Sequence, residues 1–399
     1  MAKGQPFPAQ HNITFASLDS IFASSFGLTE HDSNTFQCLK KVEDADIEVP
    51  DDIDSAVSFS EHSPPDIFSA ILTLAESVSD TQLSPAPALT SWIIRCFPYM
   101  RNAKAIKDKF IWDKVDEGIN SIKNGSTTQP KSALHSVLLR ERGLTTKEGR
   151  HPEYHSHAIA DEFFGFMTAG YDTSATTIAW GVKMLTDNLS VQKRLRDKLR
   201  SVFPDAAREK RTLSYQELSS ANIPYLDAVV DEVLRHSNSI SFVARQAQQH
   251  DTTVLGHHIP EGTNIWLMAN GPRYLEPNMN LDDQQRSLGA RQESKSTLTG
   301  VWDDDDIAKF QPDRWLRIDP DTGAEKYDSM AGPSLPFGMG LRGCYGKRLA
   351  LQVLRIHFAL IVWHFELLPT PDELSGYEAV QKFAREPTQC YLRLLEPDW

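Results

Sequence analysis

The spacing of apolar residues predicts a chain built mostly of helices. Apolar side chains recur every three or four positions over 15–26, 66–78, 92–122, 156–188, 191–203, 225–235 and 347–365, the spacing of a buried helical face. The stretch 156–188 contains no proline and is apolar on more than one face. It therefore predicts a central helix that crosses the whole core. Gly27 follows the first stretch and is a suitable residue to end that helix.

After residue 238 the apolar period changes to two. Residues 242–246, 252–255 and 264–268 predict short strands, and 391–395 could form a last one. Residues 38–65 are acidic and loop-like, and 278–300 are polar and predict a mobile surface insertion. Helices and strands do not alternate regularly. We therefore expect a mainly α fold with a minor β-sheet region, in a single domain over 1–399.

Charge and cysteine content exclude several classes of protein. The 399 residues carry a formal net charge of -13, which argues against binding nucleic acid or anionic lipid through bulk charge. The four cysteines form no CxxC pair, so neither a disulfide framework nor a structural zinc site is indicated. No run of about 18 apolar residues and no signal peptide is present. We expect an intracellular protein without a transmembrane segment.

The segment with the most chemical information surrounds Cys344. In Pro-Phe-Gly-Met-Gly-Leu-Arg-Gly-Cys-Tyr-Gly, residues 336–346, four glycines flank one cysteine directly before a predicted helix. Glycines allow tight turns and close approach of a flat ligand, and a helix start favours a thiolate, which is a strong axial ligand for iron. Arg342 could reach an anionic group of the same ligand. The alternative is a glycine-rich turn with an incidental thiol.

Other polar residues allow a structural interpretation as well as a functional one. Glu232 and Arg235 share a helical face and can pair, but such pairs are common on surfaces. Asp172 and Thr173 follow Gly170 inside the long helix, where polar side chains often bond locally or face water. The histidines at 151, 155 and 157 could bind a metal, although a solvated helix start is favoured.

The segment Phe337-Gly-x-Gly-x-Arg342-x-Cys344-x-Gly346 resembles the haem-binding signature of the cytochrome P-450 family at every defining position. The resemblance implies a cytochrome P-450 fold and haem b as the cofactor. It makes Cys344 the axial ligand of the iron, with Arg342 on a haem propionate and Phe337 shielding the proximal face. Gly346 completes the signature.

Three further segments resemble the family in the same order along the chain. Glu232, Arg235 and Arg314, the last in Phe-Gln-Pro-Asp-Arg-Trp, would form a buried ion triad with a structural role. Asp172 would relay protons and Thr173 would hydrogen-bond the oxygen, where the helix loosens beside the iron. Arg245 resembles the family's second propionate-binding residue, although a surface salt bridge there is as plausible.

The resemblance begins well inside a full-length member of the family. Full-length relatives are anchored to the endoplasmic reticulum membrane. Their membrane anchor, first strands and first helices have no counterpart in this sequence. This indicates a truncated gene model, a remnant, or a shortened but working enzyme.

The resemblance implies a haem-thiolate monooxygenase that inserts one oxygen atom of O₂ into a lipophilic small molecule, in a fungal-type secondary-metabolite pathway. Electrons would come from NADPH–cytochrome P-450 reductase, docked at Arg342, Lys347 and Arg348. Two alternatives remain: a non-catalytic remnant that binds haem poorly, and an enzyme that rearranges peroxides without a reductase. Candidate pocket residues are apolar or small: Phe166, Ala169, Ile240, Phe242 and Val243.

Overall fold

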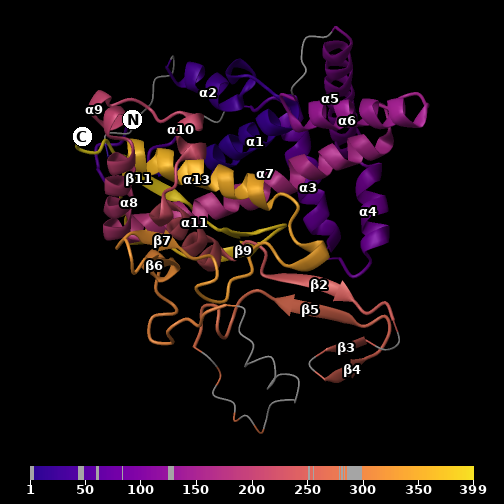
Figure 1. The fold of residues 1–399 in the computed structure, drawn as a ribbon. Helices are drawn as coiled ribbons and strands as arrows, with labels where there is room; N and C mark the ends of the chain where they lie inside the picture. Colours follow the sequence, from indigo (N-terminus) through magenta and orange to yellow (C-terminus); the bar gives the residue numbers. More distant parts are fainter. Residues whose placement is uncertain are drawn as a thin grey trace. The chain divides into compact units, whose positions relative to one another are not determined.

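The structure is a computed structural model. It describes residues 4–43, 49–59, 63–82, 84–124, 130–249, 252–254, 256–277, 279, 282, 284 and 299–399. Most of the expected insertion at 278–300 lies outside these residues. Figure 1 shows the elements, whose contacts divide the chain into two compact units. Unit 1 comprises Met1–Pro6, Thr176–Ala379 and Arg385–Trp399, and unit 2 comprises Phe7–Ala175 and Val380–Ala384. The single domain over 1–399 stays a prediction.

Unit 2 is mostly helical. Its elements are a two-residue strand, a 3-10 turn and six helices, followed by the first part of α7: β1 (Phe7–Pro8), α1 (Gln10–Phe26), η1 (Glu30–Asp32), α2 (Asn34–Glu43), α3 (Asp66–Gln82), α4 (Pro87–Cys96), α5 (Pro98–Lys123) and α6 (Ala133–Glu148). α1 ends at Gly27, whose φ of 73° gives the left-handed cap that its position predicts. α3 packs against α4 and α5, and α1 against α6.

Two expectations for unit 2 were wrong. The apolar pattern at 92–122 predicted one helix, but the structure has two, separated at Phe97. Pro98 is the reason, because a proline starts a helix well but disfavours helical backbone in the residue before it. The stretch 38–65 is not all loop, since α2 extends to Glu43.

The long central helix is α7, His157–Asp187, as the proline-free pattern predicts. The other helices that the structure describes in unit 1 are α8 (Leu189–Val202), α9 (Pro204–Glu209), α10 (Tyr215–Ser220), α11 (Pro224–Ser237), α13 (Lys347–His364) and α14 (Asp372–Ser375). Its described residues also form the 3-10 turns η3 (Pro312–Trp315) and η4 (Gly340–Arg342). α13 packs against α8, α10 and α11. The expected fold class, mainly α with small sheets, is confirmed.

The strands of unit 1 form small antiparallel pairs. They are β2 (Phe242–Gln246), β3 (Thr252–Val254), β4 (His257–Ile259), β5 (Asn264–Met268), β6 (Leu316–Ile318), β7 (Glu325–Tyr327), β8 (Glu366–Leu368), β10 (Arg385–Pro387) and β11 (Tyr391–Leu395); β9 (Ala379–Gln381) crosses the boundary between the units. β2 pairs with β5, β3 with β4, β6 with β7, and β11 with β8. In Figure 1, β2 and β5 run side by side.

A glycine lets the helices of unit 1 approach closely. A Cβ atom added at Gly181 of α7 would stand 2.3 Å from the ring of Phe358 on α13 and 3.0 Å from Val233 on α11. Phe358 and Val233 are fully buried. The absence of a side chain at Gly181 therefore lets α13, the helix that follows Cys344, pack directly on the central helix.

Candidate functional site

The thiol of Cys344 is exposed on a turn just before α13. Gly346 is the N-cap of that helix and supplies no side-chain cap, so backbone N–H groups of the first turn are left to attract negative charge. A Cβ atom added at Gly346 would stand 4.0 Å from the Cys344 sulfur, so this glycine lies beside the thiol. The turn thus presents a thiol at an accessible position directly before a helix start.

The backbone around Cys344 is held from within the turn. The amide of Cys344 donates to the carbonyl of Phe337 over 2.8 Å, and the amide of Gly343 donates to that of Gly340 over 3.0 Å. Gly338 and Gly340 have φ values of 64° and 70°, which residues with a side chain rarely adopt. The glycines therefore fix a tight loop that leads to the sulfur.

Cations surround this turn. Arg342 lies exposed in η4, and Lys347 and Arg348 are exposed in the first turn of α13. The ammonium of Lys347 lies 5.7 Å from the ring centroid of the half-buried Phe337. In a chain of net charge -13, three exposed cations close to one thiol form a local basic surface.

The other cysteines lack this combination. Burial raises the pKa of the Cys390 thiol to about 12. Cys38 is half-buried and its sulfur accepts a hydrogen bond from Asn34 over 3.5 Å. Cys96 is exposed, but it is the last residue of α4, its sulfur donates to the carbonyl of Trp92 over 3.3 Å, and no glycines flank it.

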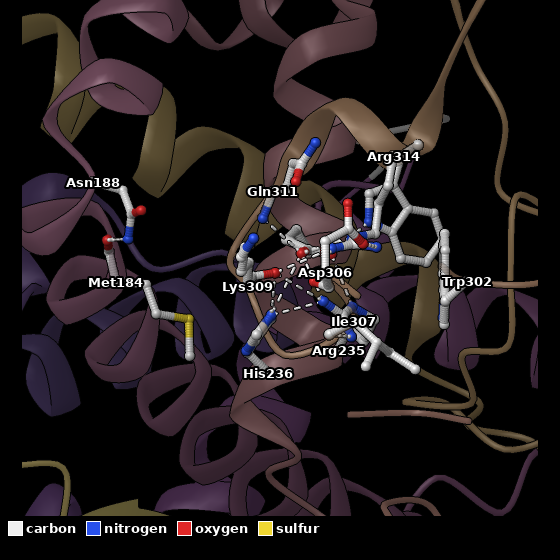
Figure 2. A network of polar contacts seen from close by, with 12 residues as sticks. Met184, Asn188, Arg235, His236, Trp302, Asp306, Ile307, Lys309, Gln311 and Arg314 are labelled. Carbon is white, nitrogen blue, oxygen red and sulfur yellow. Dashed lines mark hydrogen bonds and ion pairs between the residues drawn. The ribbon is translucent and has the colours of Figure 1, made fainter. Parts of the chain in front are cut away.

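The structure brings Glu232, Arg235 and Arg314 together in unit 1. The Glu232 carboxylate accepts bonds from Arg235 Nε and Nη2 over 2.9 and 2.8 Å, and from Arg314 Nε over 3.1 Å. Arg314 also binds Asp306 over 2.9 Å, and Figure 2 shows both arginines in this network. Burial would raise the pKa of Glu232, but the bonds from Arg235 and His236 outweigh burial and hold the pKa well below its usual range.

Sequence reasoning missed several members of this network. Trp315 donates its indole N–H to Glu232 over 2.9 Å, and the amide of Gln311 donates to the same carboxylate over 2.8 Å. The ring of Trp302 lies 5.6 and 5.3 Å from the guanidiniums of Arg235 and Arg314 (Figure 2). Trp315 directly follows Arg314 in the sequence, whereas Trp302 has no local signal that assigns it here.

Arg235 also holds two distant parts of the backbone. Its Nη1 donates to the carbonyl of Tyr274 over 2.6 Å and to that of Ile307 over 2.7 Å. Its Nη2 lies 2.8 Å from Nε2 of His236, the next residue along α11. One buried guanidinium therefore joins α11 to the segments on both sides of the region around residue 290.

Asp172 and Thr173 lie in the part of α7 that belongs to unit 2, and both are half-buried. The Thr173 hydroxyl donates to the carbonyl of Ala169 over 2.9 Å, and α7 continues as an α-helix through this point. A Cβ atom at Gly170 would stand 2.7 Å from Cδ1 of the buried Ile21. Close packing against α1 thus explains Gly170, and the expected loosening of the helix is not seen.

Arg245 lies on β2 in register with Ile265 of β5. Its Nη1 donates to the carbonyl of the adjacent Ala244 over 2.8 Å. His155 contacts Asp116 over 3.0 Å, and its ring lies tilted against that of Trp112 with 5.5 Å between the ring centroids. Among the described residues, no group of three or more His, Cys, Asp or Glu side chains could hold a metal ion.

Of the apolar pocket candidates, Phe166 and Ala169 lie on α7 in unit 2. Ile240, Phe242 and Val243 lie at and just before β2 in unit 1. The ring of Phe242 lies 4.4 Å from that of Trp266 on β5.

Comparison with known proteins identifies the family. The model of the family described as Cytochrome P450 matches residues 51–272 and 301–392. The chain belongs to the cytochrome P450 family. A cytochrome P450 monooxygenase TRI13 of Fusarium sporotrichioides is 34% identical over 100% of the chain and 71% of that protein. The Hps1-dma1 cluster cytochrome P450 monooxygenase cyp3.1 of Dothistroma septosporum is 36% identical over 72% of the chain and 96% of that protein.

Solved structures show the same fold. A crystal structure of a cytochrome P450DA heme domain superposes with a TM-score of 0.64 and 17% identity, covering 99% of the chain and 69% of that structure. This chain is thus a cytochrome P450 monooxygenase, an oxidoreductase of the fungal type, and its cofactor is haem with a cysteine thiolate ligand. Within the described residues, no helix has the length and apolarity needed to cross a membrane.

The residues around Cys344 fit that cofactor. The thiol is exposed at a helix start, the backbone of its turn is internally bonded, and the exposed Arg342 lies two residues away. A haem bound on this side needs a sulfur to ligate its iron and a nearby cation to pair with a propionate carboxylate, and Cys344 and Arg342 can supply both.

Proposed function

We propose that this cytochrome P450 inserts one oxygen atom of O₂ into a lipophilic small molecule of fungal secondary metabolism, with Cys344 as the thiolate ligand. The exposed thiol before α13 carries the proposal. One related protein is named for a gene cluster. The half of α7 in unit 2 offers Phe166 and Ala169 as apolar or small side chains, which suits a lipophilic substrate.

Haem supplies the oxygen chemistry when it is bound, and the protein positions and tunes it. Cys344 holds the cofactor from the start of α13, and Arg342 and Arg245 bind its propionates. Thr173, whose hydroxyl donates to Ala169, passes protons toward the reacting oxygen, and the adjacent Asp172 supplies them. Glu232, Arg235 and Arg314 keep the segment after α11 in place beside α13.

Electrons come from a flavoprotein partner, NADPH–cytochrome P450 reductase. Arg342, Lys347 and Arg348 provide a basic surface next to Cys344, which complements an acidic partner and speeds encounter at low salt. Arg348→Glu should lower the rate of reduction at low salt more than at high salt. A matched reversal of an exposed cation that is not part of this surface, Arg140→Glu on α6, should leave the rate unchanged. Equal rates for Arg348→Glu and the unmodified protein would contradict this docking surface.

The deciding experiment is the carbon monoxide difference spectrum of the haem-supplemented, dithionite-reduced protein. A strongly red-shifted Soret band shows thiolate-ligated haem, and Cys344→Ser should lose this band while keeping its helical circular dichroism. No haem uptake by the unmodified chain would favour a non-catalytic remnant. Turnover with a hydroperoxide but not with NADPH and reductase would favour a peroxide-rearranging enzyme.

A further inference from the structure

The carboxylate of Asp231 lies where three elements of unit 1 meet. Asp231 precedes Glu232 on α11, and α11 packs against both β7 and α13. Asp231 accepts a hydrogen bond from the hydroxyl of Tyr327, the last residue of β7. None of the bonds described above for the Glu232 network involves Asp231, so its place beside that network needs a separate explanation.

Tyr327 is fixed from its other side. It pairs with Leu316 of β6, and it packs against the buried cluster that contains Trp302 and Trp315. The next residue, Asp328, donates its amide to the carbonyl of Trp315 over 2.8 Å. The phenol that meets Asp231 is therefore held rigidly by the β6–β7 hairpin.

A cation links Asp231 to the Cys344 turn. Lys347, the first residue of α13 and three residues after Cys344, acts electrostatically on Asp231 and lowers its pKa. The same ammonium lies 5.7 Å from the ring centroid of Phe337, and the carbonyl of Phe337 accepts the amide of Cys344. Lys347 therefore interacts electrostatically with Asp231 and also lies over the ring of the residue whose carbonyl bonds the cysteine backbone.

The environment of Asp231 lets its charge change near neutral pH. Burial raises the pKa of Asp231 to about 6, and the carboxylate of Glu232 adds to this effect, while the bond from Tyr327 and the charge of Lys347 oppose it. Several charged groups on the packed elements form ion pairs: Arg314 of η3 with Glu232 and Asp306, Asp313 of η3 and Glu325 of β7 with Arg194 of α8, and Arg355 of α13 with Asp227 of α11. On the β6–β7 hairpin, Arg317 pairs with Asp328 and Lys326 with Asp319, and Arg348 of α13 is exposed.

We propose that Asp231 is a positioning residue that acts through Lys347 on the Cys344 turn and so sets the reduction potential of the haem. This rests on the assignment of Cys344 as the haem ligand. The ionised carboxylate attracts the ammonium of Lys347 toward α11 and offsets its charge near the sulfur. Since a cation near a thiolate-bound iron stabilises the reduced state, loss of the carboxylate shifts the potential to a more positive value.

A double-mutant cycle on the haem-loaded protein tests this. At pH 7.5, Asp231→Asn should shift the potential to a more positive value and Lys347→Gln to a more negative one. In the Lys347→Gln background, Asp231→Asn should shift the potential much less, because the residue it acts through is gone. An equal shift in both backgrounds, or none in either, overturns the proposal.

Asp227→Asn is the matched control. Asp227 lies one turn before Asp231 on α11 and contacts Arg355, which is eight residues beyond Lys347 on α13, or about 12 Å farther along the helix. Its substitution should leave the potential close to that of the unmodified protein. A shift as large as that of Asp231→Asn would mean that any charge lost from α11 has the effect, and this would overturn the specific role.

The pH dependence gives a second readout. The potential of the unmodified protein should fall as the pH rises through about 6, and Asp231→Asn should lack this step. If Asp231→Asn does not fold, Tyr327→Phe serves instead: it removes the bond that favours the charged form, so the step should move to higher pH. A step unchanged in either variant contradicts the proposal.

Failure of the assignment of Cys344 as the haem ligand would give a different result from failure of this proposal. Without a red-shifted carbon monoxide band in the unmodified protein, the haem-thiolate assignment fails and the effect on potential fails with it. With that band present and the cycle additive, the proposal alone fails. In haem-free protein, carboxyl NMR should show Asp231 titrating near pH 6. Its pKa should be higher in Lys347→Gln, and an unchanged pKa in that variant also contradicts the coupling.

Discussion

Replacing Glu232 by glutamine should destabilise unit 1 severely. Glu232 is fully buried, and its two oxygens accept three bonds from Arg235 and Arg314 and one each from Trp315 and Gln311, while Nε2 of His236 lies 3.4 Å from one of them. Glutamine keeps the shape but loses the charge, and it turns an –NH₂ group toward donors. The buried guanidinium of Arg235 then loses its carboxylate partner, and Arg314 keeps only Asp306. Removing one partner of such a network costs about 3–5 kcal/mol.

The assay is guanidinium unfolding followed by tryptophan fluorescence, to which Trp302 and Trp315 contribute from within the network. The matched control is Glu325→Gln. Glu325 also accepts from two cations, Arg194 and Lys198, both over 2.9 Å, but it is partly exposed. Solvent screening limits its loss to about 1 kcal/mol or less. Equal losses for the two variants would refute the argument that buried charge in this network governs stability.

Three further results are expected. Gly181→Ala should destabilise the protein by about 1–3 kcal/mol in thermal unfolding, because the added methyl meets the ring of Phe358. Gly165→Ala on the same helix, whose methyl meets nothing within 4 Å, should instead stabilise it by up to about 1 kcal/mol. Thr173→Ala should uncouple oxygen consumption from product, whereas Thr173→Ser should retain coupling; equal coupling in both would contradict the proton role. Burial lowers the pKa of His357, so the unfolded state binds its proton more readily. The midpoint temperature of thermal unfolding should therefore rise with pH up to about 6.5. A His357→Gln variant whose midpoint depends on pH in the same way would contradict this.

The elements with the clearest periodic pattern could be predicted from the sequence. β2 and β5 have the predicted bounds. Both ends of α7 lie within one residue of the predicted helix at 156–188. β4 was missed because its sequence, His257-His258-Ile259, shows no alternation of apolar and polar residues, and only Ile259 is β-branched. The break before Pro98 was missed because the apolar spacing continues across it while the proline ends the helix.

The Cys344 turn could be predicted because its residues are contiguous. The pairing of Glu232 with Arg235 follows from helical spacing, and Arg314 was added only by resemblance. Trp302 could not be placed, because its position depends on the fold bringing its ring onto the guanidiniums of Arg314 and of Arg235, which belongs to a different helix far back along the chain. Asp231 likewise has no signal in its neighbours along the chain, since its partners come from β7 and α13.

The two carbonyls held by Arg235 have a consequence for how this chain can change in length. One nitrogen of Arg235 donates to the carbonyls of both Tyr274 and Ile307. Arg235 therefore holds together the two ends of the polypeptide segment between these residues. The entropy of closing such a loop grows only with the logarithm of its length, so doubling it costs about 0.6 kcal/mol. Relatives can therefore gain or lose residues between these two points while the core beneath stays intact. The family match is interrupted between residues 272 and 301, and nearly all of that gap lies in this interval.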